Sequence, residues 1–469
     1  VMDVQPDGTL ANRKLLVKDD AVPWNPFGFY RVQVGPDDKL WLCIADHPAS
    51  LPVTLTGADG RKLQLRGKTG GMVRCNLDGS GLELVVQGFR APYVFDFDPW
   101  GHLWHISNGE GSPNLYLHVI PGMDYGYHSR DASYAWLAGK EPLSPPVREM
   151  PGGANTGALH YYSSQFPADY WGNVLIANWG SHGSNSQNRM VYRFKRQQDG
   201  RDRIGGADDA LTETAPFLTS TDPMFRPTQL VSAHDGGLYL IDWHGRDDEN
   251  DTTGRILKID YTGPGKPGLR AAPAPDTIAR MKPDALVKLL GHPNHFTREC
   301  AVRALAKTGA AAVKPLGQTA RSGDALAAAN AIWALTRIHT PAATEAMTEA
   351  LRHTDPRVRA HALRQLRQAA CQPLDSSTRV RENAAFVELR SHQRSLVATE
   401  SLAKLAAPLL HDANGEVRVE AALAQASPES VTRGLITALE KADDERLRYQ
   451  IGFELARHAD GEALLPLLN

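Results

Sequence analysis

The stretch GFRAPYVFDFDPWGHLWHISNG, from Gly88 to Gly109, decides how the first half of this chain is interpreted. Its apolar residues alternate with polar ones on both sides of a turn at residues 98–101, which is typical of two β-strands joined as a hairpin. The first strand follows Arg90 and a proline, and the second ends in small polar residues. This order leaves two interpretations open: the ends of the hairpin line a binding mouth, or they only shape a turn.

The same unit of a turn, an aromatic strand and a small polar tail recurs along the first half of the chain. The copies are VGPDDKLWLCIADH, FDPWGHLWHISNG, YWGNVLIANWGS and SAHDGGLYLIDWHG, with turn positions at Asp37, Trp100, Asn173 and Asp235. A further strand follows each copy, so repeated four-strand modules predict a β-propeller over residues 1–261. The repeats are too few to close a ring of the six-bladed type, and we expect that N-terminal blades are missing from this sequence.

The second half of the chain follows a different pattern. A Pro/Gly/Ala linker over residues 262–280 leads into residues 281–469, where apolar residues recur with helical spacing. A unit of helix pairs repeats there, with Arg298, Arg359, Arg418 and Arg448 in register and Gln372–Thr399 as a degenerate copy. This pattern predicts an all-α HEAT-repeat solenoid, cut short at its end, in which each of these arginines ties neighbouring repeats together.

Composition sets limits on the function. The 469 residues are 42% hydrophobic and 22% charged, and 51 basic residues against 53 acidic ones give a net charge of −2. We therefore expect no nucleic-acid partner, and no apolar run is long enough for a membrane span. Four separated cysteines form no CxxC or CxxCH motif, so we expect single thiols without a thiolate metal site or covalent haem; these are Cys43, Cys75, Cys300 and Cys371.

Several motifs of the strand-rich half resemble the sugar dehydrogenase propellers that use pyrroloquinoline quinone (PQQ), the glucose/sorbosone dehydrogenase class. The motifs are GGMVRCNLDGS, GFRAP, PGMDYGY, GALHYYSSQFPADYWGNVLIAN and MFRPTQLVSAHDGGLYLIDWHG. The arrangement of a propeller, a linker and HEAT repeats resembles the bacterial membrane-bound dehydrogenase proteins, which often add a C-terminal c-type haem domain. That resemblance implies an oxidoreductase that uses PQQ and Ca²⁺, with any haem c beyond Asn469.

The resemblance also implies a set of site residues. Cations are needed to hold the carboxylates of the cofactor, and arginine does so with two parallel hydrogen bonds. Arg90 and Arg226 occupy matching places in separate blades, and we predict that their guanidinium groups converge on one funnel. The alternative is that each pairs with a local carboxylate, such as Asp96 or Asp242, and only orders its blade. The predicted cofactor-binding residues are Arg90, Arg226, Asp46, Tyr93, Asp242 and His244.

This sequence departs from the family pattern at the catalytic base and at the metal site. The position of the family's base histidine falls at or near Phe27, and His47 is the nearest substitute, with a surface turn histidine as its alternative. The family's calcium segment corresponds to NGEGSPNLY, where Glu110 and Asn114 supply oxygens but the adjacent acidic pair is missing. The acidic run that follows His244 has a solvated loop as its alternative.

Two functions therefore remain in competition. The first is a quinone-dependent dehydrogenase of sugars or alcohols that passes electrons to a haem c partner or domain. The second is a non-catalytic module of propeller and HEAT repeats that binds a carbohydrate or a protein. The HEAT surface is expected to contact a protein partner in either case, and the resemblance implies a periplasmic or cell-surface location.

Overall fold

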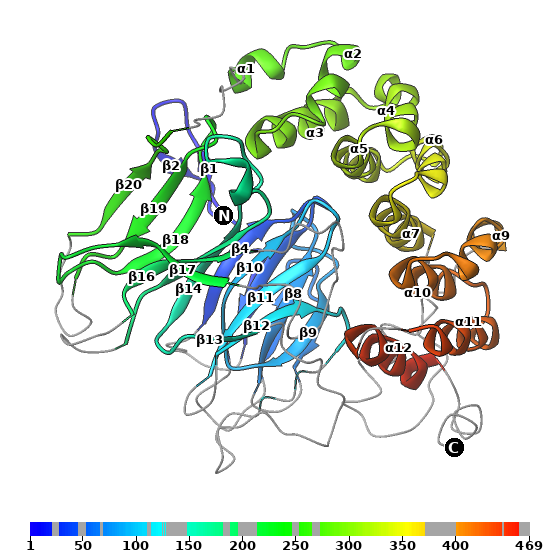
Figure 1. The fold of residues 1–469 in the computed structure, drawn as a ribbon, viewed down its shortest axis with the longest axis horizontal. Coiled ribbons are helices and arrows are strands. Elements are labelled where there is room, and N and C mark those ends of the chain that lie inside the picture. The colour runs from blue at the N-terminus through cyan, green and yellow to red at the C-terminus, as the bar shows by residue number, and fades with distance from the viewer. Residues whose placement is uncertain are drawn as a thin grey trace. The chain divides into compact units, whose positions relative to one another are not determined.

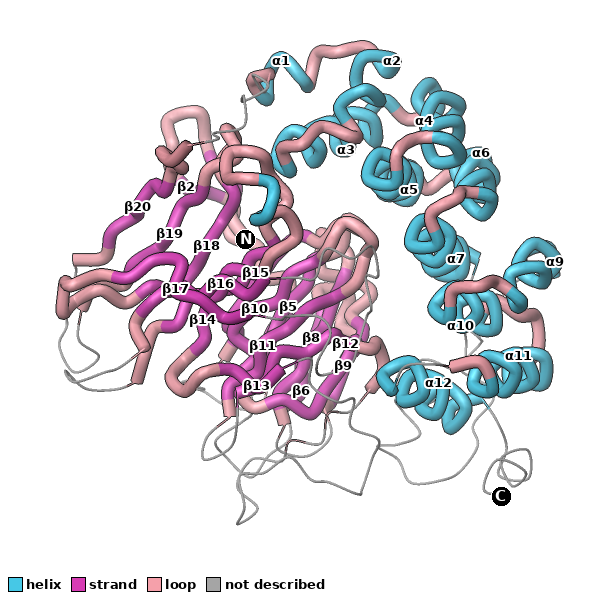
Figure 2. The backbone as a smooth tube through the Cα atoms, viewed as in Figure 1, coloured by secondary structure: helices cyan, strands magenta, loops and turns pink. Residues whose placement is uncertain are grey.

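The computed structural model describes residues 1–20, 28–45, 53–65, 69–109, 114–123, 125, 127, 148–181, 188–195, 213–245, 253–264, 273–370, 400–442 and 445–458. In these residues, strands are found as far as Ile259 and the α-helices begin at Pro275, so secondary structure changes where the sequence predicts (Figures 1 and 2). A short helix, α1 (Pro275–Ile278), lies within the predicted linker.

The strands form antiparallel sheets of neighbouring segments. The strands β1 (Asp3–Val4) and β2 (Leu10–Ala11) form a small pair. A three-stranded sheet is made by β3 (Val17–Asp19), β6 (Thr54–Gly57) and β7 (Lys62–Gln64). The sheet β4-β5-β8-β9 comprises Phe29–Val34, Leu40–Ile44, Gly70–Cys75 and Glu83–Phe89. The sheet β10-β11-β12-β13 comprises Ala91–Phe97, Leu103–Asn108, Asn114–Val119 and Arg148–Met150. The sheet β14-β15-β16-β17 comprises Asn155–His160, Val174–Asn178, Met190–Lys195 and Glu213–Thr219, and β18-β19-β20 comprise Pro227–Ser232, Leu238–Asp242 and Arg255–Ile259.

Each predicted turn connects the first two strands of one of the larger sheets. The reason is local, because a short Asp or Asn side chain can bond the backbone of its own turn. The Asp98 Oδ1 accepts the backbone N–H of Trp100 and of His102, and the Asp235 Oδ1 accepts that of Gly237. In the described residues, three of these sheets have four antiparallel strands in chain order and the last has three, while closure of the sheets into a ring of six blades stays a prediction.

The chain divides into two compact units. The first contains residues 1–95 and 104–144, and the second contains residues 96–103 and 145–469. In the first unit, one face of the sheet β4-β5-β8-β9 is covered by β3-β6-β7, since Leu42 and Val73 share a buried apolar cluster with Leu55 and Leu63. The strands β14–β20 belong to the same compact unit as the helices, and the predicted domain boundary at 261/262 stays a prediction.

In the second unit, the sheets β14-β17 and β18-β20 pack through their apolar faces. Leu175 and Val191 of the first sheet share a cluster with Leu230, Leu238 and Leu240 of the second. The opposite face of β18-β20 leaves apolar side chains exposed; these are Val231, Ile241 and Ile256. The alternation of buried and exposed residues along these strands matches the period-2 pattern of the sequence.

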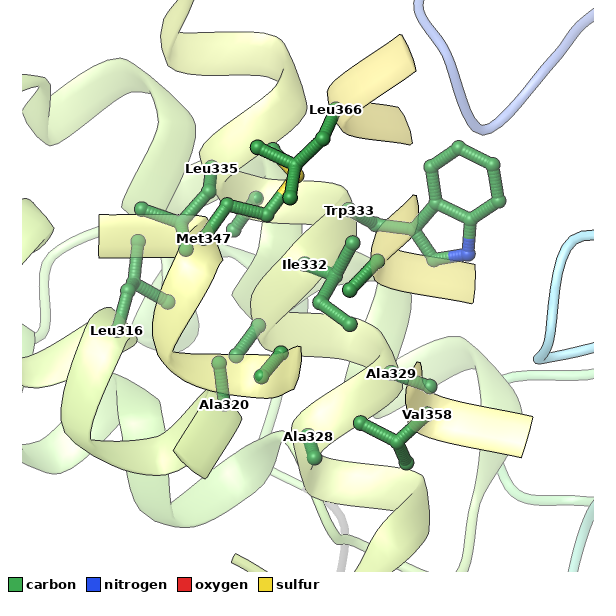
Figure 3. Packing of buried hydrophobic residues seen from close by; sticks show 14 of the residues in the cluster. Leu316, Ala320, Ala328, Ala329, Ile332, Trp333, Leu335, Met347, Val358 and Leu366 are labelled. Carbon is green, nitrogen blue, oxygen red and sulfur yellow. The ribbon is translucent and has the colours of Figure 1, made fainter. Parts of the chain in front are cut away.

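The helices follow as stacked pairs. Their bounds are α2 Pro283–Leu286, α3 His295–Thr308, α4 Ala310–Ser322, α5 Ala325–Ile338, α6 Pro341–Met347, α7 Pro356–Ala370, α9 Glu400–Ala406, α10 Gly415–Leu423, α11 Pro428–Glu440 and α12 Glu445–His458. Short 3₁₀ turns are η1 Ala168–Tyr170, η2 Val287–Leu289, η3 Thr348–Arg352 and η4 Ala407–His411. Leucine, isoleucine and alanine side chains fill the space between α4, α5, α6 and α7 (Figure 3). The segment Gln372–Thr399 lies outside the described residues.

The in-register arginines bind the turns that precede their helices. Arg359 donates to the carbonyls of His353 and Thr354 and also pairs with Asp412 at 2.8 Å, in the turn before α10. Arg418 donates to the carbonyls of Asp412 and Ala413, and at 2.8 Å to that of Lys441. The prediction that these arginines tie neighbouring repeats is confirmed for Arg359 and Arg418.

The cysteines that the structure describes are single thiols, as predicted. Cys43 and Cys75 are buried, and Cys300 is half-buried. Burial raises the pKa of the Cys75 thiol to about 11, so this group is held as a protonated thiol at neutral pH. Cys371 lies outside the described residues.

Candidate functional site

The carboxylate of Asp242 organises the end of the last sheet. This side chain is fully buried, and its Oδ1 accepts the backbone N–H of Arg226 at 2.7 Å and that of His244 at 3.1 Å. Its Oδ2 accepts Arg255 Nε at 2.7 Å across the pair of strands β19 and β20. Asp242, a predicted cofactor residue, therefore bonds two backbone amides and the Arg255 side chain of its own sheet.

The guanidinium group of Arg226 bonds backbone carbonyls through Nε and Nη1 at the edge of the same sheet. Its Nε donates to the Gly245 carbonyl at 2.9 Å, and its Nη1 donates to the carbonyls of Trp179 and Ser181 at 3.2 and 3.0 Å. The group lies 4.0 Å from the centre of the Trp179 ring, and the residue is only 1% exposed. Arg226 thus joins the ends of two neighbouring sheets, and it bonds backbone carbonyls where the alternative interpretation expected a carboxylate.

His244 bridges two parts of the last sheet at its partly exposed edge. Its Nδ1 lies 3.1 Å from Thr253 Oγ1, and its Nε2 lies 3.0 Å from Asp222 Oδ2. Asp222 also pairs with Arg255 at 2.8 Å, and the N–H of Met224 is the largest influence that lowers the pKa of Asp222. Sequence reasoning did not single out Asp222, Thr253 or Arg255; Asp222 lies two residues before the MFRPTQL motif that identified Arg226.

The other small polar tails have the same local purpose. Asn178, at the end of β15, accepts the N–H of Gly180 at 2.8 Å and donates to the Gly152 carbonyl and to Asn155 Oδ1 at 3.1 Å. Asn114 accepts the N–H of Gly109 at 3.0 Å. These side chains hold the backbone in place where it leaves each strand. In the described residues, the small polar tails therefore stabilise turns.

Arg90 and Tyr93 belong to the first unit and mark the start of β10. Arg90 is half-buried between β9 and β10, and the half-buried Tyr93 stacks on Tyr30 of β4 with ring centres 4.2 Å apart. Because Arg90 and Arg226 lie in different units, their convergence on one funnel stays a prediction.

His105 is a core histidine in the first unit. Its Nδ1 lies 2.9 Å from the Val94 carbonyl, and its ring packs 4.3 Å from the centre of Phe89. Burial lowers the pKa of His105 to about 3, so the ring is neutral and Nδ1 carries the proton that it donates.

The remaining predicted site residues lie outside the described residues. These are Asp46, His47 and Glu110, together with Phe27 at the expected base position. Among the residues that the structure does describe, no group of three or more His, Cys, Asp or Glu side chains could hold a metal ion. In the same residues, no helix is both long and apolar enough to span a bilayer.

Comparisons with known families match both halves of the chain. The model of a family described as a domain of unknown function (DUF7133) matches residues 28–247, and the HEAT-repeat model matches residues 313–373. No curated protein matches the chain. The helical region therefore contains HEAT repeats, as predicted.

Solved structures similar to this chain include sugar dehydrogenases. A glucose dehydrogenase has a TM-score of 0.35 and 16% identity, and the match covers 55% of this chain and 89% of that protein. The PQQ-bound aldose sugar dehydrogenase of Streptomyces coelicolor has a TM-score of 0.32 and 13% identity, with 51% and 81% covered. The holo PQQ domain of pyranose dehydrogenase from Coprinopsis cinerea has a TM-score of 0.29 and 13% identity, with 55% and 87% covered. Scores of this size describe a similarity alone, and the site must be interpreted from its own residues.

Proposed function

We propose that this chain is a quinone-dependent dehydrogenase of sugars or alcohols that passes electrons to a haem c partner or domain. The observation that carries the proposal is the motif run from Gly70 to Asn108, which resembles the PQQ-dependent class and forms the successive strands β8 to β11. In the proposed arrangement, the sheets are blades of a propeller of the six-bladed type. A periplasmic or cell-surface location belongs to the same proposal.

The described residues fit the cofactor only in part. PQQ would supply the acceptor for a hydride and carries carboxylates that need cations. Nε and Nη1 of Arg226 already bond backbone carbonyls, so these two nitrogens could bind a cofactor carboxylate only if those bonds broke. Arg90 and Tyr93, both half-buried in the first unit, stay proposed cofactor residues. Asp46 and His47 as cofactor and base residues, and Glu110 with Asn114 as Ca²⁺ ligands, remain part of the proposal.

The second candidate function is a non-catalytic module that binds a carbohydrate or a protein. The contacts of Arg226 and Asp242 favour it, since both residues bond groups of the chain itself and these bonds need no cofactor. Phe27 at the expected position of the base favours it as well. In this case the propeller and the HEAT surface would serve recognition alone.

Reconstitution distinguishes the two functions. The chain would be incubated with PQQ and Ca²⁺, and binding would be followed by the quinone absorbance and turnover by reduction of a dye with aldoses or simple alcohols. The dehydrogenase proposal expects saturable binding and dye reduction, and we expect Arg90→Ala to weaken PQQ binding at least tenfold. Arg61→Ala, at an exposed arginine of the same unit, is the matched control. A folded chain that neither binds PQQ nor reduces the dye would leave the binding module as the function.

A further inference from the structure

The turn between β10 and β11 is held by the helices. Residues 96–103 belong to the same compact unit as α3 to α12, and Trp100 shares a buried apolar cluster with α4, α5 and α7. We use the name turn groove for the surface that receives this turn; it is formed by Trp333 of α5, by Arg357, His361 and Arg364 of α7, and by Glu416 of α10.

Backbone carbonyls of the turn are bound by side chains of the groove. The indole Nε1 of Trp333 donates to the Pro99 carbonyl at 3.3 Å, and Arg364 Nη1 donates to the Trp100 carbonyl at 3.2 Å. The Arg357 guanidinium lies 4.1 Å from the centre of the Trp100 ring, which is a cation–π distance. The groove therefore recognises both the shape of the turn and its aromatic side chain.

His102 forms the polar centre of this contact. Its Nδ1 lies 2.8 Å from Asp98 Oδ2 in the same turn, and its Nε2 lies 2.7 Å from Glu416 Oε1 on α10. The ring is buried, so the two nitrogens face two carboxylates away from water. Only an imidazolium carries the two N–H groups that both contacts need; a neutral ring would turn one lone pair towards a carboxylate.

The charged side chains around His102 also favour the protonated form of its ring. Arg364 bonds Glu416 at 2.5 Å and Glu420 at 3.0 Å, and Arg367 pairs with Glu420 at 3.1 Å. With Asp98, three carboxylates thus face two guanidinium groups, and a protonated His102 makes the cluster neutral. A buried cluster that keeps an uncompensated charge is strongly disfavoured.

The remaining charged groups of the groove do not change this balance. Arg357 is paired with Asp355 at 2.6 Å. His361, whose ring lies 4.5 Å from that of Trp333, is fully buried, and burial lowers its pKa to about 3. It is therefore neutral while His102 is charged.

We propose that the turn Asp98–His102 and the turn groove form a proton-operated clasp, which is closed when His102 is protonated and weakened when His102 loses its proton. The inference is independent of the dehydrogenase function, since it uses no residue of the candidate cofactor site. It adds a pH response to a contact between a sheet turn and a HEAT surface.

The direction of the response follows from linkage. Burial by itself lowers the pKa of His102, but the carboxylates of Asp98 and Glu416 more than offset this, and the pKa is raised above its ordinary value. A raised pKa means that the full contribution of the clasp is present below the unfolded value of about 6.5. The contribution is lost as the pH rises through the folded value, by up to about tenfold in the closing equilibrium per pH unit.

Hydrogen exchange of the full chain between pH 6 and 10 tests the clasp. The amides of Asp98, Gly101 and His102 are hydrogen-bonded within the turn, so their protection, corrected for the intrinsic rate, reports its docking. We expect protection to fall by up to about tenfold per pH unit above the His102 midpoint. NMR of ¹³Cε1-labelled histidine should give the same midpoint, with His102 assigned by His102→Gln.

The variant Glu416→Gln distinguishes a contact that depends on the protonation of His102 from a contact that does not. It removes one of the two carboxylates while keeping a group of the same shape, so the His102 midpoint and the loss of protection should both move to lower pH. His411→Gln, at an exposed histidine of η4, is the control and should change neither. A pH-independent protection of the turn, or a His102 midpoint at or below 6.5 that Glu416→Gln leaves in place, would overturn the proposal.

Discussion

Arg226 shows how a single side chain can match a functional motif and still have a structural purpose. Sequence reasoning placed it at the mouth of a blade, because it occupies the position that matches Arg90. Its three carbonyl acceptors belong to residues 179, 181 and 245, which lie 19 to 47 residues away from Arg226 in the sequence. No local pattern identifies carbonyl acceptors, so this purpose became visible only in three dimensions.

Arg226→Met is expected to destabilise the second unit without any cofactor present. The substitution leaves the carbonyls of the buried Trp179 and Gly245 and of the exposed Ser181 without their donor, and it should lower the free energy of unfolding by about 2–4 kcal/mol. The measurement is the thermal unfolding midpoint of the apoprotein by calorimetry. Arg433→Met is the control, because Arg433 is exposed in a helical ion pair with Glu429, and it should cost at most about 0.5 kcal/mol. Equal midpoints for Arg226→Met and Arg433→Met would show that the carbonyl contacts contribute nothing.

At the scale of elements, the repeating pattern of the sequence carried most of the information. The turns at Asp37, Trp100, Asn173 and Asp235 and the helices that begin after polar turns were predicted because Asp, Asn and Gly bond or bend the backbone locally. The sheet β3-β6-β7 was not predicted, since β3 pairs with a segment beyond β4 and β5. Pairings of this kind depend on long-range packing, which sequence periodicity does not encode.

The turn between β10 and β11 requires a glycine at position 101, and this requirement can be tested. Its φ is +80°, and a Cβ there would lie 2.9 Å from Trp333 Cζ2 and 3.0 Å from His361 Nδ1. Gly101→Ala should therefore add a steric conflict with the groove to the backbone cost of about 1–2 kcal/mol. Hydrogen exchange of residues 98–102 should then show faster opening at every pH.

Gly60→Ala is the matched control for this glycine. Gly60 has the same φ of +80°, but a Cβ there would meet nothing within 4 Å. It should carry the backbone cost alone and leave protection at residues 98–102 unchanged. The contrary result would be that the two substitutions destabilise the chain equally and leave hydrogen exchange at residues 98–102 unchanged. That result would show that the close approach of Gly101 to the turn groove contributes nothing to the free energy of unfolding.

For the whole molecule, composition predicts the order of the two architectures, whereas the grouping of strands with helices into compact units depends on tertiary contacts. The change from aromatic and glycine-rich strands to alanine- and leucine-rich helices is a property of composition, and the sequence places it correctly. The grouping of β14–β20 with the helices depends on contacts such as Arg298 Nη2 to the Tyr162 carbonyl at 3.0 Å. The candidate site was predictable only as a set of positions, because the engagement of each side chain follows from tertiary neighbours.

Buried histidines give both units the same response to acid. The pKa of His105 in the first unit and that of His361 in the second are each lowered to about 3 by burial, against an ordinary value of 6.5. A histidine that is neutral in the folded state takes up a proton only on unfolding when the pH is between these values. Each ring should therefore reduce the free energy of unfolding by about 1.4 kcal/mol per pH unit as the pH falls below 6.5. His102 has the opposite sign and acts only above that value.

Calorimetry of the full chain from pH 4 to 8 measures this acid response. We expect His361→Leu to flatten the decline of the unfolding midpoint below pH 6.5. Neither ring nitrogen of His361 has a hydrogen-bond partner among the described residues, so a leucine there leaves no bond unmade on the ring itself. His105→Gln should act in the same way in the first unit, since an amide N–H can still donate to the Val94 carbonyl. At pH 8 both histidines are neutral whether the chain is folded or unfolded, so each substitution should change the midpoint there by a packing term alone. A decline below pH 6.5 that is equally steep in the wild type and in both variants would mean that these rings are already protonated in the folded chain.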